Sequence, residues 1–62
     1  MLIEVTNNLK DEKYNNEKFM LNTDAIVAIR NDKVLGTVVV MNNGTVYEVK
    51  EKYKNLTNKI NG

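Results

Sequence analysis

The side chains of this chain that could take part in acid–base or metal chemistry are its eight carboxylates, because histidine and cysteine are absent. Serine is absent as well, so a single chain lacks the side chains of the usual nucleophile systems. Five carboxylates fall in polar or turn-forming stretches: Asp11, Glu12, Glu17, Asp24 and Asp32. A calcium loop needs oxygen ligands around a glycine, and residues 7–18 contain no glycine. We therefore expect these acids to serve turns and solubility, with no enzyme activity, metal or cofactor.

Positive charge gathers in the C-terminal part of the chain. Its basic residues are Lys50, Lys52, Lys54 and Lys59. Lysines grouped in this way could contact the phosphate backbone of a nucleic acid, although the same pattern is typical of a solvated helix face. Arginine, which dominates the reading of bases, occurs only at Arg30, and the net charge is just +1. Nucleic-acid binding through the four lysines is therefore the alternative to a protein-contact function.

The strongest structural signal is the Asn43-Gly44 pair, which lies between two stretches rich in β-branched residues. A type I′ turn needs positive φ at both central positions, so this pair predicts a β-hairpin. With these residues at the centre of the turn, Met41 pairs with Val46. Alternation of side chains then gives two faces, one with Val38, Val40, Tyr47 and Val49 and the other with Thr37, Val39, Met41 and Val46.

Three further strands are predicted ahead of this hairpin. Alternating apolar and polar residues favour a strand over residues 2–6, and apolar runs favour strands over residues 19–21 and 25–30. Residues 7–18 between the first two strands are polar and charged, so we expect a long hairpin loop there. Asn22, Thr23 and Asp24 are turn formers and end the second strand.

The C-terminal part of the chain changes period. Tyr53, Leu56 and Ile60 are spaced as one face of an amphipathic helix, which we predict over residues 51–61 without a capping side chain at its start. The predicted fold class is α+β and mostly β: a small antiparallel five-strand sheet or partly closed barrel with one C-terminal helix. We expect one domain over residues 1–62, with the first hairpin in 1–22 and three strands in 25–50.

The hairpin predicts a surface for self-association. The face that carries Val39, Met41 and Val46 is apolar, and a single helix covers only one face of a sheet. The other face must be covered by the first hairpin or by another copy of the chain, because exposed apolar patches usually mark contact sites. We therefore predict a homo-oligomer that associates through Val39, Met41 and Val46, and a closed monomeric barrel-like fold is the alternative.

Residues from Phe19 onward follow a pattern formed by Phe19-Met20-Leu21-Asn22, Ile26, Ile29, Thr37-Val38, Asn43-Gly44, Tyr47, Val49-Lys50-Glu51, Leu56 and Ile60. This pattern resembles the FlbD family of small flagellar and swarming-motility proteins. It spans about two-thirds of the chain. The long stretch 7–18 and the missing serine before the helix depart from the family pattern. Because the family has no catalytic residues to carry over, the resemblance implies a non-enzymatic interaction or assembly module linked to flagellar or swarming motility.

A weaker resemblance concerns DNA-binding proteins. The hairpin followed by a helix is similar to the first half of LytTR DNA-binding domains. Those domains continue with further strands that this chain lacks, so the resemblance implies the scaffold of such a domain without its DNA-reading loops. It keeps nucleic acid as the alternative partner.

The cellular location can also be predicted from apolar runs. The longest of them is far too short to span a membrane, and the segment Met1-Leu2-Ile3-Glu4 is unlike a signal peptide. We therefore expect a cytoplasmic bacterial or phage protein with an unknown protein partner and no membrane contact.

Overall fold

Five β-strands precede one α-helix in the computed structural model of the chain, which describes residues 1–10 and 13–61. The elements are β1 (Leu2–Thr6), β2 (Lys18–Asn22), the 3-10 turn η1 (Thr23–Ala25), β3 (Ile26–Asp32), β4 (Gly36–Met41), β5 (Val46–Val49) and α1 (Tyr53–Asn61). The predicted fold class is confirmed, and the predicted element ends differ by one or two residues. No helix in this part of the chain is long and apolar enough to cross a membrane.

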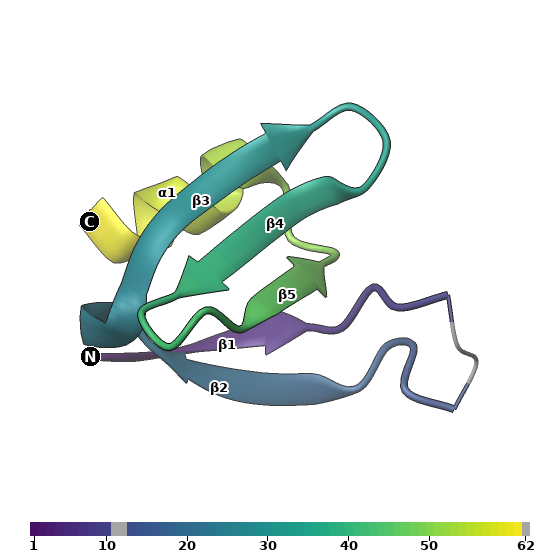
Figure 1. Ribbon diagram of the computed structural model, residues 1–62, viewed down its shortest axis with the longest axis horizontal. Helices are drawn as coiled ribbons and strands as arrows, with labels where there is room; N and C mark the ends of the chain where they lie inside the picture. Colours follow the sequence, from purple (N-terminus) through teal and green to yellow (C-terminus); the bar gives the residue numbers. More distant parts are fainter. Residues whose placement is uncertain (11–12, 62) are drawn as a thin grey trace.

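The described strands form two antiparallel sheets that do not close into a barrel. β1 pairs with β2, and β3, β4 and β5 form the second sheet in that order. The sheets meet at one corner, where Asn7 bridges Val49 and the Lys50 amide donates to the Thr6 carbonyl at 2.8 Å. Figure 1 shows β1 running beside β5 at this corner. The first hairpin is thereby attached to the second sheet by backbone hydrogen bonds.

The β4–β5 hairpin turns through three residues instead of the two that the sequence predicts. The Met41 amide donates to the Thr45 carbonyl at 2.8 Å, and the Gly44 amide donates to the Met41 carbonyl at 2.9 Å. Gly44 has a φ of 87°, whereas Asn43 does not take a positive φ. This is a type I turn followed by a glycine bulge, which is another common hairpin loop.

The longer turn shifts the register of the hairpin by one residue. Val40 pairs with Val46, so the predicted pairing of Met41 with Val46 is wrong. Because side chains alternate along a strand, a one-residue shift moves every side chain of β5 to the opposite face. Tyr47 therefore lies on the same face as Val39, with which it pairs.

The hydrophobic core lies against the face of the β3–β4–β5 sheet that carries Val39, which we call the inner face. The buried apolar residues that form this core are Ile3, Val5, Leu21, Val39, Met41, Val49 and Leu56. They come from the first hairpin, the sheet and α1, and Figure 1 shows α1 behind β3. The rings of Phe19 and Tyr47 add to this contact, with centroids 5.1 Å apart. The first hairpin thus shares the inner face with α1 and leaves the opposite face of the sheet uncovered.

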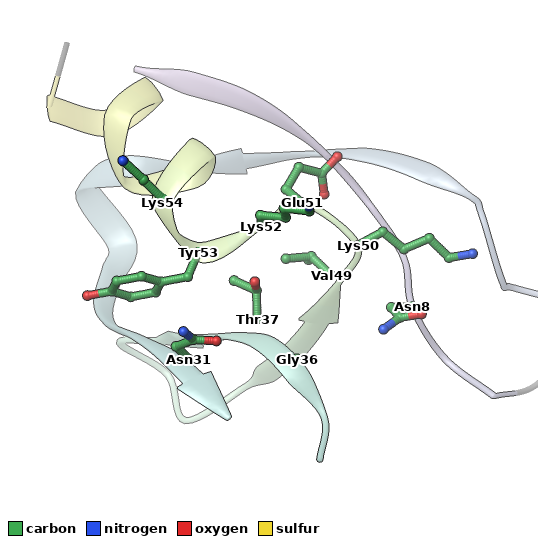
Figure 2. Close-up of a pocket in the computed structure, with 10 residues that line it drawn as sticks. All are labelled: Asn8, Asn31, Gly36, Thr37, Val49, Lys50, Glu51, Lys52, Tyr53 and Lys54. Carbon is green, nitrogen blue, oxygen red and sulfur yellow. The ribbon is translucent and has the colours of Figure 1, made fainter. Parts of the chain in front are cut away.

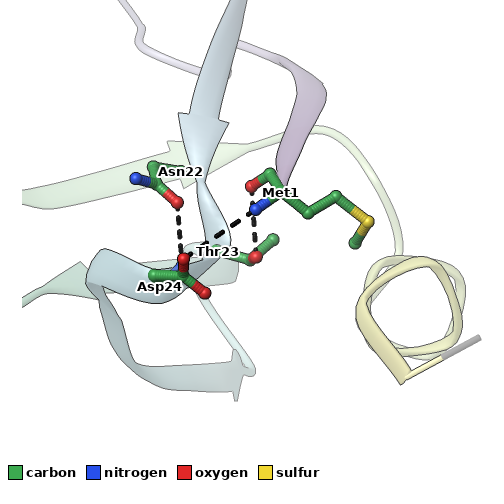
Figure 3. Close-up of polar contacts among 4 residues, drawn as sticks. All are labelled: Met1, Asn22, Thr23 and Asp24. Atoms are coloured by element: carbon green, nitrogen blue, oxygen red, sulfur yellow. Dashed lines mark hydrogen bonds and ion pairs between the residues drawn. The ribbon is translucent and has the colours of Figure 1, made fainter.

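A small hydrogen-bonded corner sets where β3 begins (Figure 3). The Asn22 side chain accepts from the Asp24 amide at 3.0 Å. The amide and the hydroxyl of Thr23 both donate to the Met1 carbonyl, at 2.8 and 3.1 Å. The Asp24 carboxylate also lies 4.0 Å from the Met1 amino group. These contacts hold the start of β1 against the end of β2 where the chain crosses to the second sheet.

Leu56 anchors α1 in the core and has no exposed surface. We expect Leu56→Ala to lower the free energy of unfolding by about 2–5 kcal/mol, because it removes apolar contacts and leaves a cavity. Urea denaturation followed by circular dichroism measures this. The matched control is Val34→Ala in the exposed turn between β3 and β4, which should change stability by less than about 0.5 kcal/mol. Equal losses in the two variants would contradict this core.

Candidate functional site

A pocket with a volume of about 400 Å³ opens where β5 leads into α1 (Figure 2). Its walls come from the connection at residues 49–54, from the end of β3, from the start of β4 and from Asn8 beyond the first hairpin's β1. Residues far apart in the sequence therefore meet at one point of the surface. We take this basic pocket as the candidate site and refer to it below as the α1 pocket.

Thr37 lies at the base of the α1 pocket. It is only 4% exposed and pairs with Val49 across the sheet. Figure 2 shows its side chain directed from β4 toward the connection that carries Lys52 and Tyr53. No described residue forms a hydrogen bond with its hydroxyl. Thr37 is therefore a buried polar side chain whose hydrogen-bonding capacity is unused by the part of the chain that the structure describes.

The start of α1 carries further free donors beside the same pocket, which Tyr53 and Lys54 line and Asn55 does not. The first hydrogen bond of the helix runs from the Leu56 amide to the Lys52 carbonyl at 2.9 Å. The amides of Tyr53, Lys54 and Asn55 come before it and have no partner among the described residues. The Lys52 side chain has no oxygen that could accept them, as the sequence predicts for an uncapped helix. Tyr53, expected in the apolar stripe of the helix, is instead partly exposed and lines the pocket.

The four lysines predicted to contact nucleic acid do not all lie at the same place on the surface. Lys50, Lys52 and Lys54 line the α1 pocket, whereas Lys59 lies in the last turn of α1 and does not. Figure 2 shows Lys50 and Lys54 extending in opposite directions. Three of the four positive charges therefore surround one pocket, and the four do not form a row along the helix.

Glu51 connects the α1 pocket to the first hairpin. Its carboxylate oxygens accept from the Thr6 amide at 2.8 Å and from the Thr6 hydroxyl at 2.9 Å. Partial burial raises the pKa of Glu51, but the hydrogen bonds from Thr6, its own amide and the charge of Lys59 outweigh burial and leave the pKa below the usual 4.5. No sequence signal pointed to this pair, because Thr6 and Glu51 are 45 residues apart. The charged Glu51 side chain thus fixes the end of β1 beside the start of α1.

The residues predicted to form a self-association surface lie on two different faces of the sheet. Val39 has no exposed surface and Met41 is 9% exposed, because the first hairpin and α1 cover both. Val46 is 56% exposed on the opposite face. The one-residue shift of the hairpin register is the physical reason for this separation. Whether copies of the chain associate stays a prediction, but these three residues do not share one surface.

The acids that the sequence assigned to turns are placed as follows. Asp32 accepts from the amides of Leu35 and Val34 at 2.9 and 2.8 Å, and these hydrogen bonds hold its pKa below the usual value. Asp11 and Glu12 lie outside the described residues. In the described part of the chain, no three acidic side chains come together as a metal site would require.

Comparison with protein families identifies a match to a family described as flagellar and swarming motility proteins and named FlbD. The match runs over residues 3–62 and therefore covers nearly the whole chain. It includes residues 7–18, the long stretch that departs from the family pattern. Comparisons with curated proteins and with solved structures gave no match.

The Glu51 contacts predict a pH dependence of stability. Because the pKa of Glu51 is lower in the folded chain than the usual 4.5, its stabilising effect is complete above pH 4.5 and is lost as the pH falls through the folded pKa. We expect Glu51→Gln to remove part of the acid-induced loss of stability and to lower the free energy of unfolding at pH 7 by about 1–3 kcal/mol. The measurement is urea denaturation at a series of pH values.

The control for this series is Glu4→Gln, which removes a charge from an exposed glutamate of β1. No described residue forms a hydrogen bond with the Glu4 side chain. This variant should keep the pH dependence of the wild type. If Glu51→Gln and Glu4→Gln gave the same pH profile, the proposed role of the Thr6 contact would be wrong.

Proposed function

This chain belongs to the FlbD family of flagellar and swarming motility proteins, and we propose that within motility it acts as a non-enzymatic assembly module. The family supports the link to motility. The finer role rests on one observation, which is a row of apolar residues on the face of the β3–β4–β5 sheet that no described element covers. We further propose that copies of the chain associate through this face.

The outer face is the side of the β3–β4–β5 sheet turned away from the core. Ala28, Val40 and Val46 lie side by side on it, one from each strand. Val27, the extra residue at a bulge in β3, is also exposed. Since both α1 and the first hairpin pack on the inner face, no described element covers this row. Val46 and Val27 are 56% and 64% exposed, Ala28 and Val40 are partly buried, and Val38 in the next row is 6% exposed. Exposed apolar residues grouped on a sheet are typical of a protein contact site.

The next row of the outer face has opposite charges at its two ends. Arg30 on β3 and Glu48 on β5 flank Val38 on β4. Neither charged side chain has an ion-pair partner among the described residues. A second copy related by a twofold axis parallel to the strands would set Arg30 of each copy over Glu48 of the other. The outer face is therefore complementary to itself in charge as well as apolar, which favours a second copy as its partner.

The alternative function is a nucleic-acid-binding regulator. The observation in its favour is the grouping of Lys50, Lys52 and Lys54 around the α1 pocket. The two functions differ in their response to salt. Nucleic-acid binding weakens steeply as salt increases because it depends on the release of counterions. Association through the apolar row should weaken far less, because salt screens only the Arg30–Glu48 pairs at its side.

Val46→Lys tests the proposed function directly. Val46 is exposed, so the variant should keep the circular dichroism spectrum and the melting temperature of the wild type within a few degrees. We expect the mass of the wild type from light scattering to rise with concentration, while Val46→Lys stays a monomer because the lysine would be desolvated in the contact. The matched control is Val34→Lys, which introduces the same charge at an exposed valine outside the outer face.

The same variants test the link to motility in a swarming bacterium whose own family member has been replaced by this chain. Val46→Lys should reduce the rate of swarming, and Val34→Lys should leave it unchanged. A wild type that is monomeric at its highest soluble concentration would contradict self-association. Normal swarming with Val46→Lys would contradict an assembly role for the outer face.

A further inference from the structure

We propose that the α1 pocket is a binding site for a single oxyanion, which is a carboxylate or a phosphate group. The site is formed by the free amides at the start of α1, by the Thr37 hydroxyl and by the lysines around the pocket. It lies on a different part of the surface from the outer face. The proposal therefore stands whether or not the chain assembles through that face.

The free amides are the main hydrogen-bond donors of the site. The amides of Tyr53, Lys54 and Asn55 have no acceptor among the described residues, and they lie at the end of the helix where the helix dipole is positive. A nine-residue helix is long enough to carry this dipole. Amides in this arrangement bind an oxyanion without any rearrangement of the backbone.

Thr37 is the independent observation that points to a ligand. It is the only hydroxyl-bearing residue of β4, which otherwise continues as Val38-Val39-Val40. A valine would fill the same space. The Thr37 hydroxyl is not among the buried unpaired side-chain atoms of the described residues, so it is accessible from the pocket although the rest of the side chain is buried. The Thr37 hydroxyl lines the α1 pocket and could donate to an oxyanion held at the start of the helix. The Thr37 hydroxyl and the amides at the start of α1 are therefore donors that one oxyanion could use together.

The charge around the α1 pocket favours an anion. Lys50, Lys52 and Lys54 contribute three positive charges to its lining, and Glu51 is the one acidic residue among the lining residues. The Glu51 carboxylate is already engaged by Thr6, and Figure 2 shows it directed away from Thr37. Its negative charge therefore does not occupy the position that an oxyanion would take.

The arrangement of the lysines favours one anionic group over a continuous phosphate backbone. The α1 pocket, at about 400 Å³, is larger than one oxyanion and leaves room for part of the molecule that carries it. Lys50 and Lys54 diverge around the pocket, and Lys59 is separate from it. A nucleic-acid strand would need a row of positive charges along the surface, which this arrangement does not provide.

The test is a titration of the full chain, labelled with nitrogen-15, with inorganic phosphate and separately with acetate at constant ionic strength. We expect saturable shifts of the amide resonances of Tyr53, Lys54 and Asn55 with at least one of the two anions. Thr37→Val and Lys52→Gln should each weaken binding by about tenfold, as expected for the loss of one charge-assisted hydrogen bond. Lys59→Gln removes the same charge from the same helix and should leave binding unchanged.

The two probes separate the sources of the anion. Binding of phosphate alone would indicate a phosphate ligand, and binding of acetate would indicate a carboxylate, as carried by an acidic side chain. Both results support the proposal. The proposal fails if neither anion shifts the three amides, or if Thr37→Val and Lys52→Gln bind as the wild type does.

A single-stranded oligonucleotide forms the third arm of the experiment. If it binds and Lys59→Gln weakens it as much as Lys52→Gln does, the whole basic tail is the binding surface and the pocket proposal is overturned. Denaturation by urea in phosphate and in chloride gives a second readout. Phosphate should stabilise the wild type more than Lys52→Gln, because a ligand that binds only the folded chain stabilises it.

Discussion

A chain of 62 residues has one hairpin and one helix with which to cover a three-stranded sheet, and both pack on the same face. Small domains bury a modest share of their surface, so concentrating the cover on one side gives a single continuous core. Val39 and Leu56 are fully buried in that core as a result. Because the first hairpin and α1 pack on the inner face, Val46 on the outer face stays in contact with solvent. The surface available for assembly is thus a direct consequence of how the core is built.

The corner between β1, β5 and α1 connects the core to the candidate binding site. Thr6 is held there through its carbonyl by the Lys50 amide, and through its amide and hydroxyl by the Glu51 carboxylate. These contacts fix the β5–α1 connection and, with it, the direction of the first turn of the helix. Tyr53 and Lys54 of that turn line the α1 pocket together with Thr37. The position of the α1 pocket therefore depends on Thr6 near the start of the chain and on Glu51 near its end.

The sequence was sufficient for much of the fold. Alternation in residues 2–6, the Asn43-Gly44 pair and the spacing of Leu56 and Ile60 are local patterns, and each predicted its element correctly. It was not sufficient for the hairpin register, because the same pair fits both a two-residue turn and a three-residue turn with a glycine bulge. The three-residue turn places Tyr47 on the inner face with Val39, where Phe19 packs against it. That contact comes from the first hairpin, so no local pattern could reveal it.

The sequence by itself determined the order of the elements, the family and the residue types that are missing from the chain, since these depend on neighbouring residues or on composition alone. Only the tertiary structure decided which face of the sheet is buried and which residues form a site. Thr37, Lys52 and Glu51 have ordinary local surroundings in the sequence. Their roles arise because long-range packing brings β4, β1 and the start of α1 together, and side chains joined in this way have no fixed spacing along the chain.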